Sequence, residues 1–199
     1  MKEHPILFST QMVKAILEGR KSMTRRTRGL EKINENPDKY HFEGHFSKPF
    51  DIPKDWKLIK FPYGEIGDRL WVRETWMRAP NVDFIPNGAF YYKASVSNQF
   101  LKKWPKGWKP SIHMPKEACR IWLEITNIRV ERLQNITRSD IRAEGLKCPP
   151  ELLSDDVYPN YRNWYPKAFK ELWESINGKG SWDKNPWVWV IEFKRIEHA

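Results

Sequence analysis

Residues 187–193 read Trp187-Val188-Trp189-Val190-Ile191-Glu192-Phe193, and the first five of them are apolar. Successive side chains of a strand point to opposite faces, so this run predicts a strand that is buried on both faces, in the middle of a sheet or barrel. Residues 119–133 carry the longest strand signal, because Ile121, Leu123 and Ile125 recur at every second position. These two stretches decide the expected sheet.

The other regular elements are predicted from caps, periodicity and proline or glycine punctuation. They are a helix that Ser9 or Thr10 caps and Gly19 ends, a strand over 70–76, a short strand over 89–94, a helix from Thr137 to Gly145 and a helix from about Pro166 to Gly178. Residues 146–162 are predicted to form a loop. The strands are few and do not alternate with helices, so an α+β fold is favoured over a doubly wound α/β fold. The expected architecture is a small mixed β-barrel or sheet with peripheral helices.

The chain is predicted to form a single domain, residues 1–199, because domains commonly have about 100–200 residues. Two stretches, at about 28–62 and 78–110, contain many prolines and no clean period. They are predicted to be long insertions into that domain, since proline interrupts regular elements.

The chain is strongly basic: 35 Lys and Arg against 25 Asp and Glu give a net charge of +10, and the pI is about 9.6. Such a surface favours polyanions or phosphorylated ligands. No apolar run approaches the ~20 residues of a membrane span, and the N-terminus has no signal-peptide pattern. With only Cys119 and Cys148, a disulfide scaffold is excluded, and a cytoplasmic protein without membrane contact is expected.

Common catalytic and cofactor motifs are absent from the sequence. The phosphate-cradling glycine loops, the H-E-x-x-H zinc motif and the G-x-S-x-G elbow do not occur. His41 and His45 have no third ligand nearby, so neither a metal nor another cofactor is expected. The remaining candidate for chemistry is the densest charge cluster, Arg20-Lys21-Ser22-Met23-Thr24-Arg25-Arg26.

Lys21 and Thr24 combine a base with a nucleophile. Neighbouring arginines lower the pKa of a lysine, and a threonine hydroxyl attacks only with a base beside it. Glu74 is predicted to lie on the apolar face of its strand, between Val72 and Trp76, where a carboxylate is costly without a partner. We expect Lys21 to be that partner. The alternative is a purely structural ion pair, which spacing alone favours because such pairs outnumber catalytic ones.

Residues 19–26, Gly19-Arg20-Lys21-Ser22-Met23-Thr24-Arg25-Arg26, resemble the G-x-K-x-x-(E/T)-x-R signature of the ASCH domain superfamily, whose fold is similar to PUA RNA-binding domains. Residues 67–76, 111–115 and 185–193 resemble a long branch of that superfamily found in phages and prophages. The resemblance covers most of the chain. It implies a β-barrel with peripheral helices, a cleft lined by the signature, and a nucleoside or nucleic-acid ligand.

One branch of the superfamily is an amidohydrolase that removes the acyl group from N4-acetylcytidine, with a lysine base, a threonine nucleophile and a glutamate. By this resemblance Lys21 matches the lysine, Thr24 the threonine and Glu74 the glutamate. Many members have Glu where Thr24 stands, so Thr24 favours the amidohydrolase pattern. The chain is longer than the compact amidohydrolases, so its added segments could reshape or cover the cleft.

Two functions follow as hypotheses. The first is a metal-independent amidohydrolase for an N-acylated nucleoside or modified nucleobase, with Lys21 as base, Thr24 as nucleophile and Glu74 as orienting group and proton shuttle. The second is a non-catalytic module that binds RNA or DNA, with RNA favoured. A protein-binding surface over residues 104–115 is a weaker third alternative. The side chains expected to bind the ligand are Arg20, Arg25, Arg26, Trp71, Arg73, Trp76 and His113.

Overall fold

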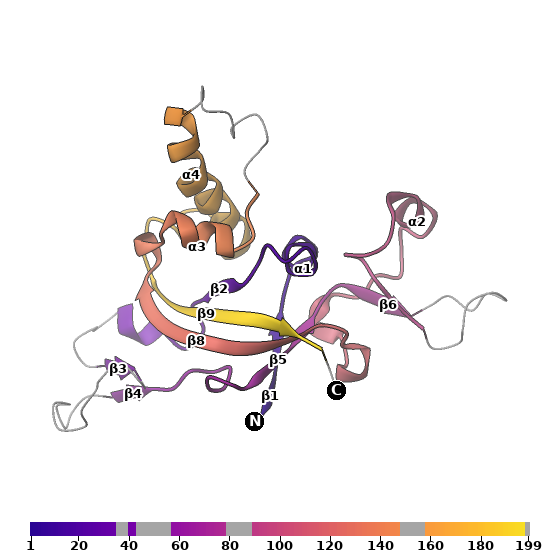
Figure 1. The fold of residues 1–199 in the computed structure, drawn as a ribbon, viewed down its shortest axis with the longest axis horizontal. Coiled ribbons are helices and arrows are strands. Elements are labelled where there is room, and N and C mark those ends of the chain that lie inside the picture. The colour runs from indigo at the N-terminus through magenta and orange to yellow at the C-terminus, as the bar shows by residue number, and fades with distance from the viewer. Residues whose placement is uncertain (35–39, 43–56, 79–88, 148–157, 198–199) are drawn as a thin grey trace.

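The computed structural model describes residues 1–34, 40–42, 57–78, 89–147 and 158–197. Its centre is a five-stranded mixed sheet with strand order β1-β5-β8-β9-β2 (Figure 1). Its strands are β1 (Glu3–Leu7), β2 (Met23–Arg26), β5 (Arg69–Arg73), β8 (Trp122–Arg132) and β9 (Trp187–Ile196). Two small sheets accompany it, one of β3 (Tyr40–Phe42) with β4 (Lys57–Ile59) and one of β6 (Trp76–Arg78) with β7 (Phe90–Tyr92).

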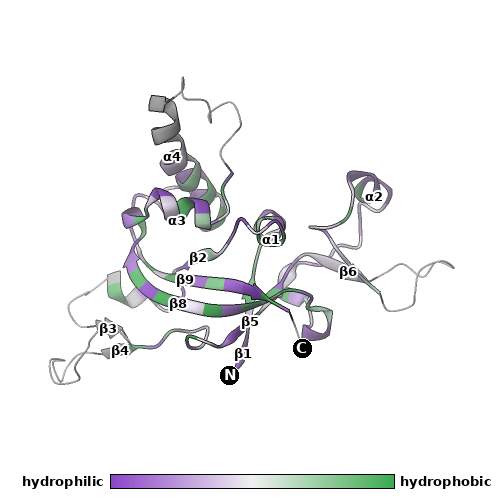
Figure 2. Cartoon of the chain, in the orientation of Figure 1, coloured by the Kyte–Doolittle hydropathy of each residue, from purple (hydrophilic) through white to green (hydrophobic). Residues whose placement is uncertain are grey.

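The two strongest strand predictions are confirmed, and these strands form the longest pair of the sheet. β8 and β9 run antiparallel from the pair Trp122–Ile196 to the pair Arg132–Trp187, with one irregularity near Ile125. Figure 2 shows hydrophobic residues recurring along both strands between hydrophilic ones. The continuous apolar run over residues 187–191 lets β9 bury side chains on both faces of the sheet.

Helices surround the sheet, and two of them begin as their sequences predict. The helices are α1 (Thr10–Leu17), α2 (Asn98–Lys103), α3 (Arg138–Ala143) and α4 (Tyr158–Asn177). Ser9 caps α1 by accepting from the backbone N–H of Met12. Thr137 and Asp140 form a reciprocal capping box at the start of α3. None of the helices in the described ranges is long and apolar enough to cross a membrane.

Helix α4 begins earlier than its sequence predicts. It starts at Tyr158 and contains Pro166, so both the expected start at Pro166 and the expected loop over residues 158–162 are wrong. Phe169 and Trp173 of this helix are buried in a hydrophobic core. That packing outweighs the one intrahelical hydrogen bond that Pro166 cannot donate, because helices in proteins depend mainly on tertiary burial.

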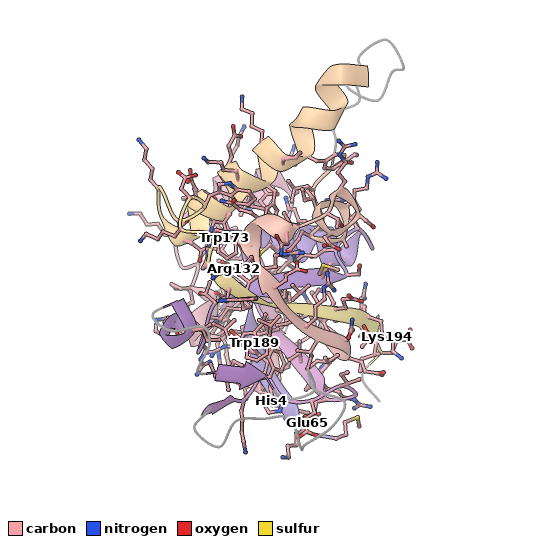
Figure 3. The ribbon with its side chains drawn as sticks, turned by 90° about the vertical axis from the view of Figure 1, so that its left-hand side faces the viewer. His4, Glu65, Arg132, Trp173, Trp189 and Lys194 are labelled. Atoms are coloured by element: carbon pink, nitrogen blue, oxygen red, sulfur yellow. The ribbon has the colours of Figure 1, made fainter. Side chains whose placement is uncertain are left out.

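Hydrophobic cores lie on both faces of the sheet. One face buries Trp189 and Ile191 of β9 against helix α1, and the other buries Val188 and Val190 against helices α3 and α4. Figure 3 shows Trp173 of α4 and Trp189 of β9 on the two sides of the sheet. Side chains of β2 therefore enter one core or the other according to their position in the strand.

The sheet is open, and the expectation of a closed barrel is wrong for the described residues. Among the described strands, the edge strand β1 pairs only with β5 and the edge strand β2 pairs only with β9. The side chain of Arg26 in β2 reaches across and donates to the backbone carbonyl of Leu7 in β1, at 2.6 Å. In a closed barrel, β1 and β2 would be joined by backbone hydrogen bonds; here a side-chain hydrogen bond connects them instead. We call the gap between β1 and β2 the seam.

Two strand predictions are corrected near the seam. The expected strand over 70–76 is divided, since β5 ends at Arg73 and β6 begins at Trp76, with Glu74 between them. β1 has no counterpart among the predicted strands, and it contains Pro5. Proline is tolerated there because β1 is an edge strand. The predicted insertions fall partly on residues 35–39, 43–56 and 79–88, which lie outside the described residues.

Candidate functional site

Lys21 lies in a buried ion pair with Glu144 at the outer edge of β2. Its Nζ donates to Glu144 Oε2 at 2.7 Å, to the Glu144 carbonyl at 2.9 Å and to the Met23 carbonyl at 2.7 Å. Three hydrogen bonds use all the protons of an ammonium group. The Lys21 side chain is fully buried, and that of Glu144 is 4% exposed.

Two helix ends bring this pair together. Gly19 ends α1 with a positive φ, and the backbone N–H of Lys21 then donates to the carbonyl of Ala15. Gly145 follows Glu144 with φ of 93°, and a Cβ there would lie 2.8 Å from Cβ of Ala15 and 2.9 Å from Cβ of Lys21. Gly145 is therefore needed both for its backbone conformation and for the close approach of the two segments.

Burial lowers the pKa of Lys21 below 10.5, although the charge and hydrogen bond of Glu144 act in the opposite direction. The positive charges of Arg26 and Arg25 lower this pKa further. The sequence prediction of a lysine whose pKa is depressed beside arginines is thus consistent with the structure. Such a lysine gives up its proton more readily than an exposed one.

The expected pairing of Lys21 with Glu74 is wrong. Glu74 lies between β5 and β6 and accepts two hydrogen bonds from Arg120, at 2.9 and 3.0 Å. Arg120 in turn stacks on Tyr92, with 4.0 Å from its guanidinium carbon to the ring centroid. A buried carboxylate did need a cation, as the sequence indicated, but a nearer arginine supplies it. Glu144 takes the place beside Lys21 that the hypothesis gave to Glu74.

Glu144 is the functional candidate that sequence reasoning missed. It lies 123 residues after Lys21, so no local spacing connects the two. The available signal was its position directly before Gly145, at the end of a helix whose start the capping box had already marked. That signal fixes the end of a helix but does not say what lies opposite it.

Arg25 is enclosed by carboxylates. Its guanidinium contacts Glu131 at 2.6 Å, Asp140 at 2.9 Å and Glu144 at 3.2 Å, and its side chain is 1% exposed. We call these four residues the Arg25 network. Because the charge of Arg25 is fully compensated by its neighbours, the predicted phosphate contact does not suit this residue.

Thr24 lies on the opposite face of β2 from Arg25. It pairs with Ile191 of β9 and is 1% exposed, on the side of the sheet that carries Ile191 and Phe8. The ring of Phe8 lies 5.7 Å from Nζ of Lys21 and 5.1 Å from the guanidinium carbon of Arg26. Strand alternation puts Thr24 on the same face as Arg26. Thr24 therefore lies on the same side of the sheet as Phe8, whose ring is close to both Lys21 and Arg26.

A cleft of about 130 Å³ lies beside the Lys21–Glu144 pair. Its polar wall includes Glu144, Arg25 and Arg26, and its apolar wall comes from α4 through Phe169 and Trp173. Lys21 and Thr24 do not line this cleft; Glu144 stands between it and Lys21. Chemistry at Thr24 therefore requires the side chains that cover it to move when a substrate binds.

The remaining predicted ligand-binding residues are scattered. Arg20 pairs with Glu18 and donates to the Gly145 carbonyl. Trp76 is 3% exposed and packs on Phe90, so it presents no face for a ligand to stack on. His113 is exposed in a short 3₁₀ turn (Ser111–His113), and Trp71 is half-buried under Arg73. Within the described part of the chain, no three His, Cys, Asp or Glu side chains are grouped as metal ligands would be.

Arg26 and Arg73 do come together. With Arg28 and Tyr63 they line a second cavity of about 190 Å³, which also touches Pro5 and Leu7 of β1. This cavity lies in the seam, and its residues come from β1, β2, β5 and the segments that follow β2 and β4. The sequence had named two of these three arginines as ligand-binding residues.

Comparisons with known proteins give one structural likeness. No protein-family model matches the chain, and no curated protein matches it. A crystal structure of the ASCH domain from Lactobacillus crispatus JV V101 matches with 13% sequence identity and a TM-score of 0.36, and the alignment covers 99% of this chain and 81% of that chain.

Proposed function

We propose that this chain is an ASCH-like amidohydrolase that removes the acyl group from an N-acylated nucleoside or modified nucleobase. The observation that carries the proposal is the buried pair of Lys21 and Glu144, joined at 2.7 Å, three residues from Thr24. A buried amine with a lowered pKa and an adjacent carboxylate can exchange a proton. A threonine beside such an amine has the base that it needs to act as a nucleophile.

In the first half of the proposed reaction, Lys21 passes a proton to Glu144 and then accepts the Oγ1 proton of Thr24. The Thr24 oxygen forms a bond to the acyl carbon, the carbon–nitrogen bond of the amide breaks, and the proton on Lys21 goes to the leaving nitrogen. In the second half, water attacks the acyl ester and gives a proton to the same amine. The acid product leaves, and Thr24 recovers its proton.

Arg26 is suited to stabilise the oxyanion that forms in each half. It lies on the same face of β2 as Thr24 and is not paired with a carboxylate of any described residue. A fixed cation aimed at a developing negative charge lowers the barrier without reorganising during the reaction. Leu172 and Ile176 of α4 also line the cleft and are more exposed than the core residues Phe169 and Trp173, so they supply an apolar wall for a flat base.

The test is hydrolysis of N4-acetylcytidine and a panel of other N-acyl nucleosides, followed by chromatography. Thr24→Val removes the nucleophile with little change in shape and is expected to abolish turnover. Glu144→Gln is expected to lower kcat by about 10²- to 10⁴-fold, the range for a lost proton transfer. Glu131→Gln is the matched control, because Glu131 contacts Arg25 but not Lys21.

Two results would overturn the proposal. The first is wild-type protein that hydrolyses no member of the panel. The second is Thr24→Val protein that is folded and keeps wild-type turnover. An equal loss of activity in Glu131→Gln and Glu144→Gln would assign both effects to the Arg25 network and remove Glu144 from the mechanism.

A non-catalytic module that binds nucleic acid is the second candidate. Three arginines with no carboxylate partner among the described residues line the seam, and this observation favours it. Such a module would bind oligonucleotides with a strong salt dependence and would show no turnover.

A further inference from the structure

The seam cavity concentrates positive charge from separate parts of the chain. Arg26 ends β2, Arg28 follows it, and Arg73 ends β5. None of the three has a salt bridge to a carboxylate of a described residue, whereas Arg25, one position before Arg26, has three. Three guanidinium groups around about 190 Å³ therefore keep their net charge.

Neutral groups hold two of these arginines in place. Arg26 donates to the Leu7 carbonyl, and Arg73 donates to the carbonyls of Met114 and Ile112. The guanidinium of Arg73 also lies over the ring of Trp71, 5.3 Å from its centroid. Carbonyls and rings fix a guanidinium without cancelling its charge. Binding an anion therefore costs less side-chain conformational entropy, because the fold already holds these arginines in place.

Tyr63 supplies a rigid aromatic wall to the same cavity. Its ring lies 5.4 Å from that of Phe61, which lies 5.1 Å from the core residue Trp189. The turn that follows Tyr63 is tied to the N-terminus, because Asp68 accepts from the backbone N–H of Lys2 at 2.6 Å. Oδ2 of Asp68 in this turn also lies 3.5 Å from Nε2 of His4 in β1, which is labelled in Figure 3.

The seam cavity adjoins the cleft beside Glu144. Arg26, Arg28 and Tyr63 line both. A ligand can therefore place an apolar, flat group against α4 in the cleft and a negatively charged group among the arginines of the seam. Guanidinium groups match phosphate oxygens through paired, charge-assisted hydrogen bonds.

We infer that the seam is a phosphate subsite, and that the substrate of the proposed reaction is a nucleotide rather than a free nucleoside. The inference rests on the proposed function for the reaction at Glu144 and Thr24, but the binding of phosphate stands on the seam alone. The phosphate belongs either to a mononucleotide or to a nucleotide within a strand. Both present the same oxyanion to Arg26, Arg28 and Arg73.

Isothermal titration calorimetry of the full chain with three probes tests this inference: cytidine, cytidine 5′-monophosphate and a single-stranded hexacytidine RNA. The monophosphate is expected to bind about tenfold tighter than cytidine or more, as charge-assisted hydrogen bonds to phosphate require. Arg28→Gln is expected to remove most of this preference. Arg28 is exposed, and its side chain donates no hydrogen bond to a described residue. Its backbone carbonyl accepts from Nε1 of Trp189, a bond that glutamine at this position keeps, so the replacement leaves the fold intact.

The matched control is Arg138→Gln, which removes one exposed positive charge from α3. It is expected to keep the preference for the monophosphate. RNA binding that Arg28→Gln weakens, without binding of the monophosphate, supports the subsite and identifies the strand as the source of the phosphate. Three results overturn the inference. The first is equal affinity for cytidine and its monophosphate, and the second is a preference for the monophosphate that Arg28→Gln leaves unchanged. The third is that none of the three probes binds.

These outcomes are separate from those of the hydrolysis assay. Turnover of N-acyl nucleosides that gains nothing from a 5′-phosphate would keep the proposed function and overturn the phosphate subsite. Phosphate-dependent binding without turnover on any N-acyl substrate would keep the subsite and overturn the amidohydrolase.

Discussion

Arg25 and Arg26 are adjacent in sequence and differ completely in their surroundings. Arg25 points toward α3 and α4, is 1% exposed and contacts three carboxylates. Arg26 points to the other face of β2, toward Phe8, and its described hydrogen bond goes to the neutral carbonyl of Leu7. One arginine is part of the internal structure, and the other belongs to a positively charged cavity.

The difference shows that a count of basic residues does not locate an anion site. An arginine that is surrounded by carboxylates presents no net charge to a ligand, however close it lies to a cleft. An arginine held by carbonyls keeps its charge and is oriented in advance. The useful measure is therefore the summed charge of each guanidinium and the groups that contact it. This sum is positive for the arginines of the seam, whereas carboxylates compensate the charge of Arg25 in the Arg25 network.

Replacing Arg25 gives the largest expected effect on stability. Arg25→Met leaves Glu131, Asp140 and Glu144 close together without their shared cation, and breaking a buried ion pair in this way costs about 3–5 kcal/mol. Urea denaturation at neutral pH measures the free energy of unfolding. A loss below about 1 kcal/mol, the range of surface ion pairs, would show that the Arg25 network is not structural.

Arg78→Met is the control for that experiment. Arg78 pairs with Glu117, and both side chains are more than half exposed. Its removal is expected to change the free energy of unfolding by at most about 1 kcal/mol, because solvent screens exposed pairs.

Acid should weaken the Arg25 network through Asp140. Burial tends to raise the pKa of Asp140, but the backbone N–H of Thr137 and the charges of Arg25 and Arg129 outweigh it, so the pKa lies below 3.8. A carboxylate with a depressed folded pKa stabilises the protein above its unfolded pKa, and that stability is lost as the pH falls through the folded value. Wild type should therefore lose part of its stability below about pH 4.

Asp140→Asn removes this titration. At neutral pH the variant is expected to be less stable by about 1–2 kcal/mol, the size of a lost helix cap. The difference from wild type should shrink as the pH falls below 3.8. Urea denaturation across this range measures it, with Asp183→Asn as the control at an exposed pair with Lys170. A difference that is constant with pH would contradict the assignment.

The smallest expected effect is on the salt dependence of RNA binding, and it tests whether the seam arginines, unlike Arg25, contact phosphates. If the seam contacts the backbone of single-stranded RNA, Arg28→Gln should reduce the slope of log affinity against log salt by about 0.7, the value for one lost phosphate contact. Arg138→Gln should leave that slope unchanged. A wild-type slope near zero would exclude phosphate contacts altogether.

The sequence was most informative where structure depends on neighbouring residues. Alternating apolar side chains predicted β8, and a continuous apolar run predicted β9. Ser9 or Thr10 predicted the start of α1, and Thr137 predicted the start of α3. It was least informative where tertiary packing opposed local preference. Pro166 suggested the start of a helix, but α4 extends through it.

The candidate site divides in the same way. Lys21 and Thr24 could be named from the sequence, because a lysine among arginines and a hydroxyl three residues later form a local pattern. The partner of Lys21 could not be named correctly. Glu74 and Glu144 are both buried carboxylates, and only the fold puts Arg120 beside one and Lys21 beside the other.

The sequence by itself determined the main strands, the capped helices and a strongly basic chain with a lysine–threonine pair. The tertiary structure decided which carboxylate meets Lys21, which face of β2 carries neutralised charge, and where the unpaired arginines gather. The physical reason is the sequence distance over which each effect acts. Propensity, alternation and capping act over a few residues, whereas the net charge of a site depends on side chains that the fold brings together from distant segments.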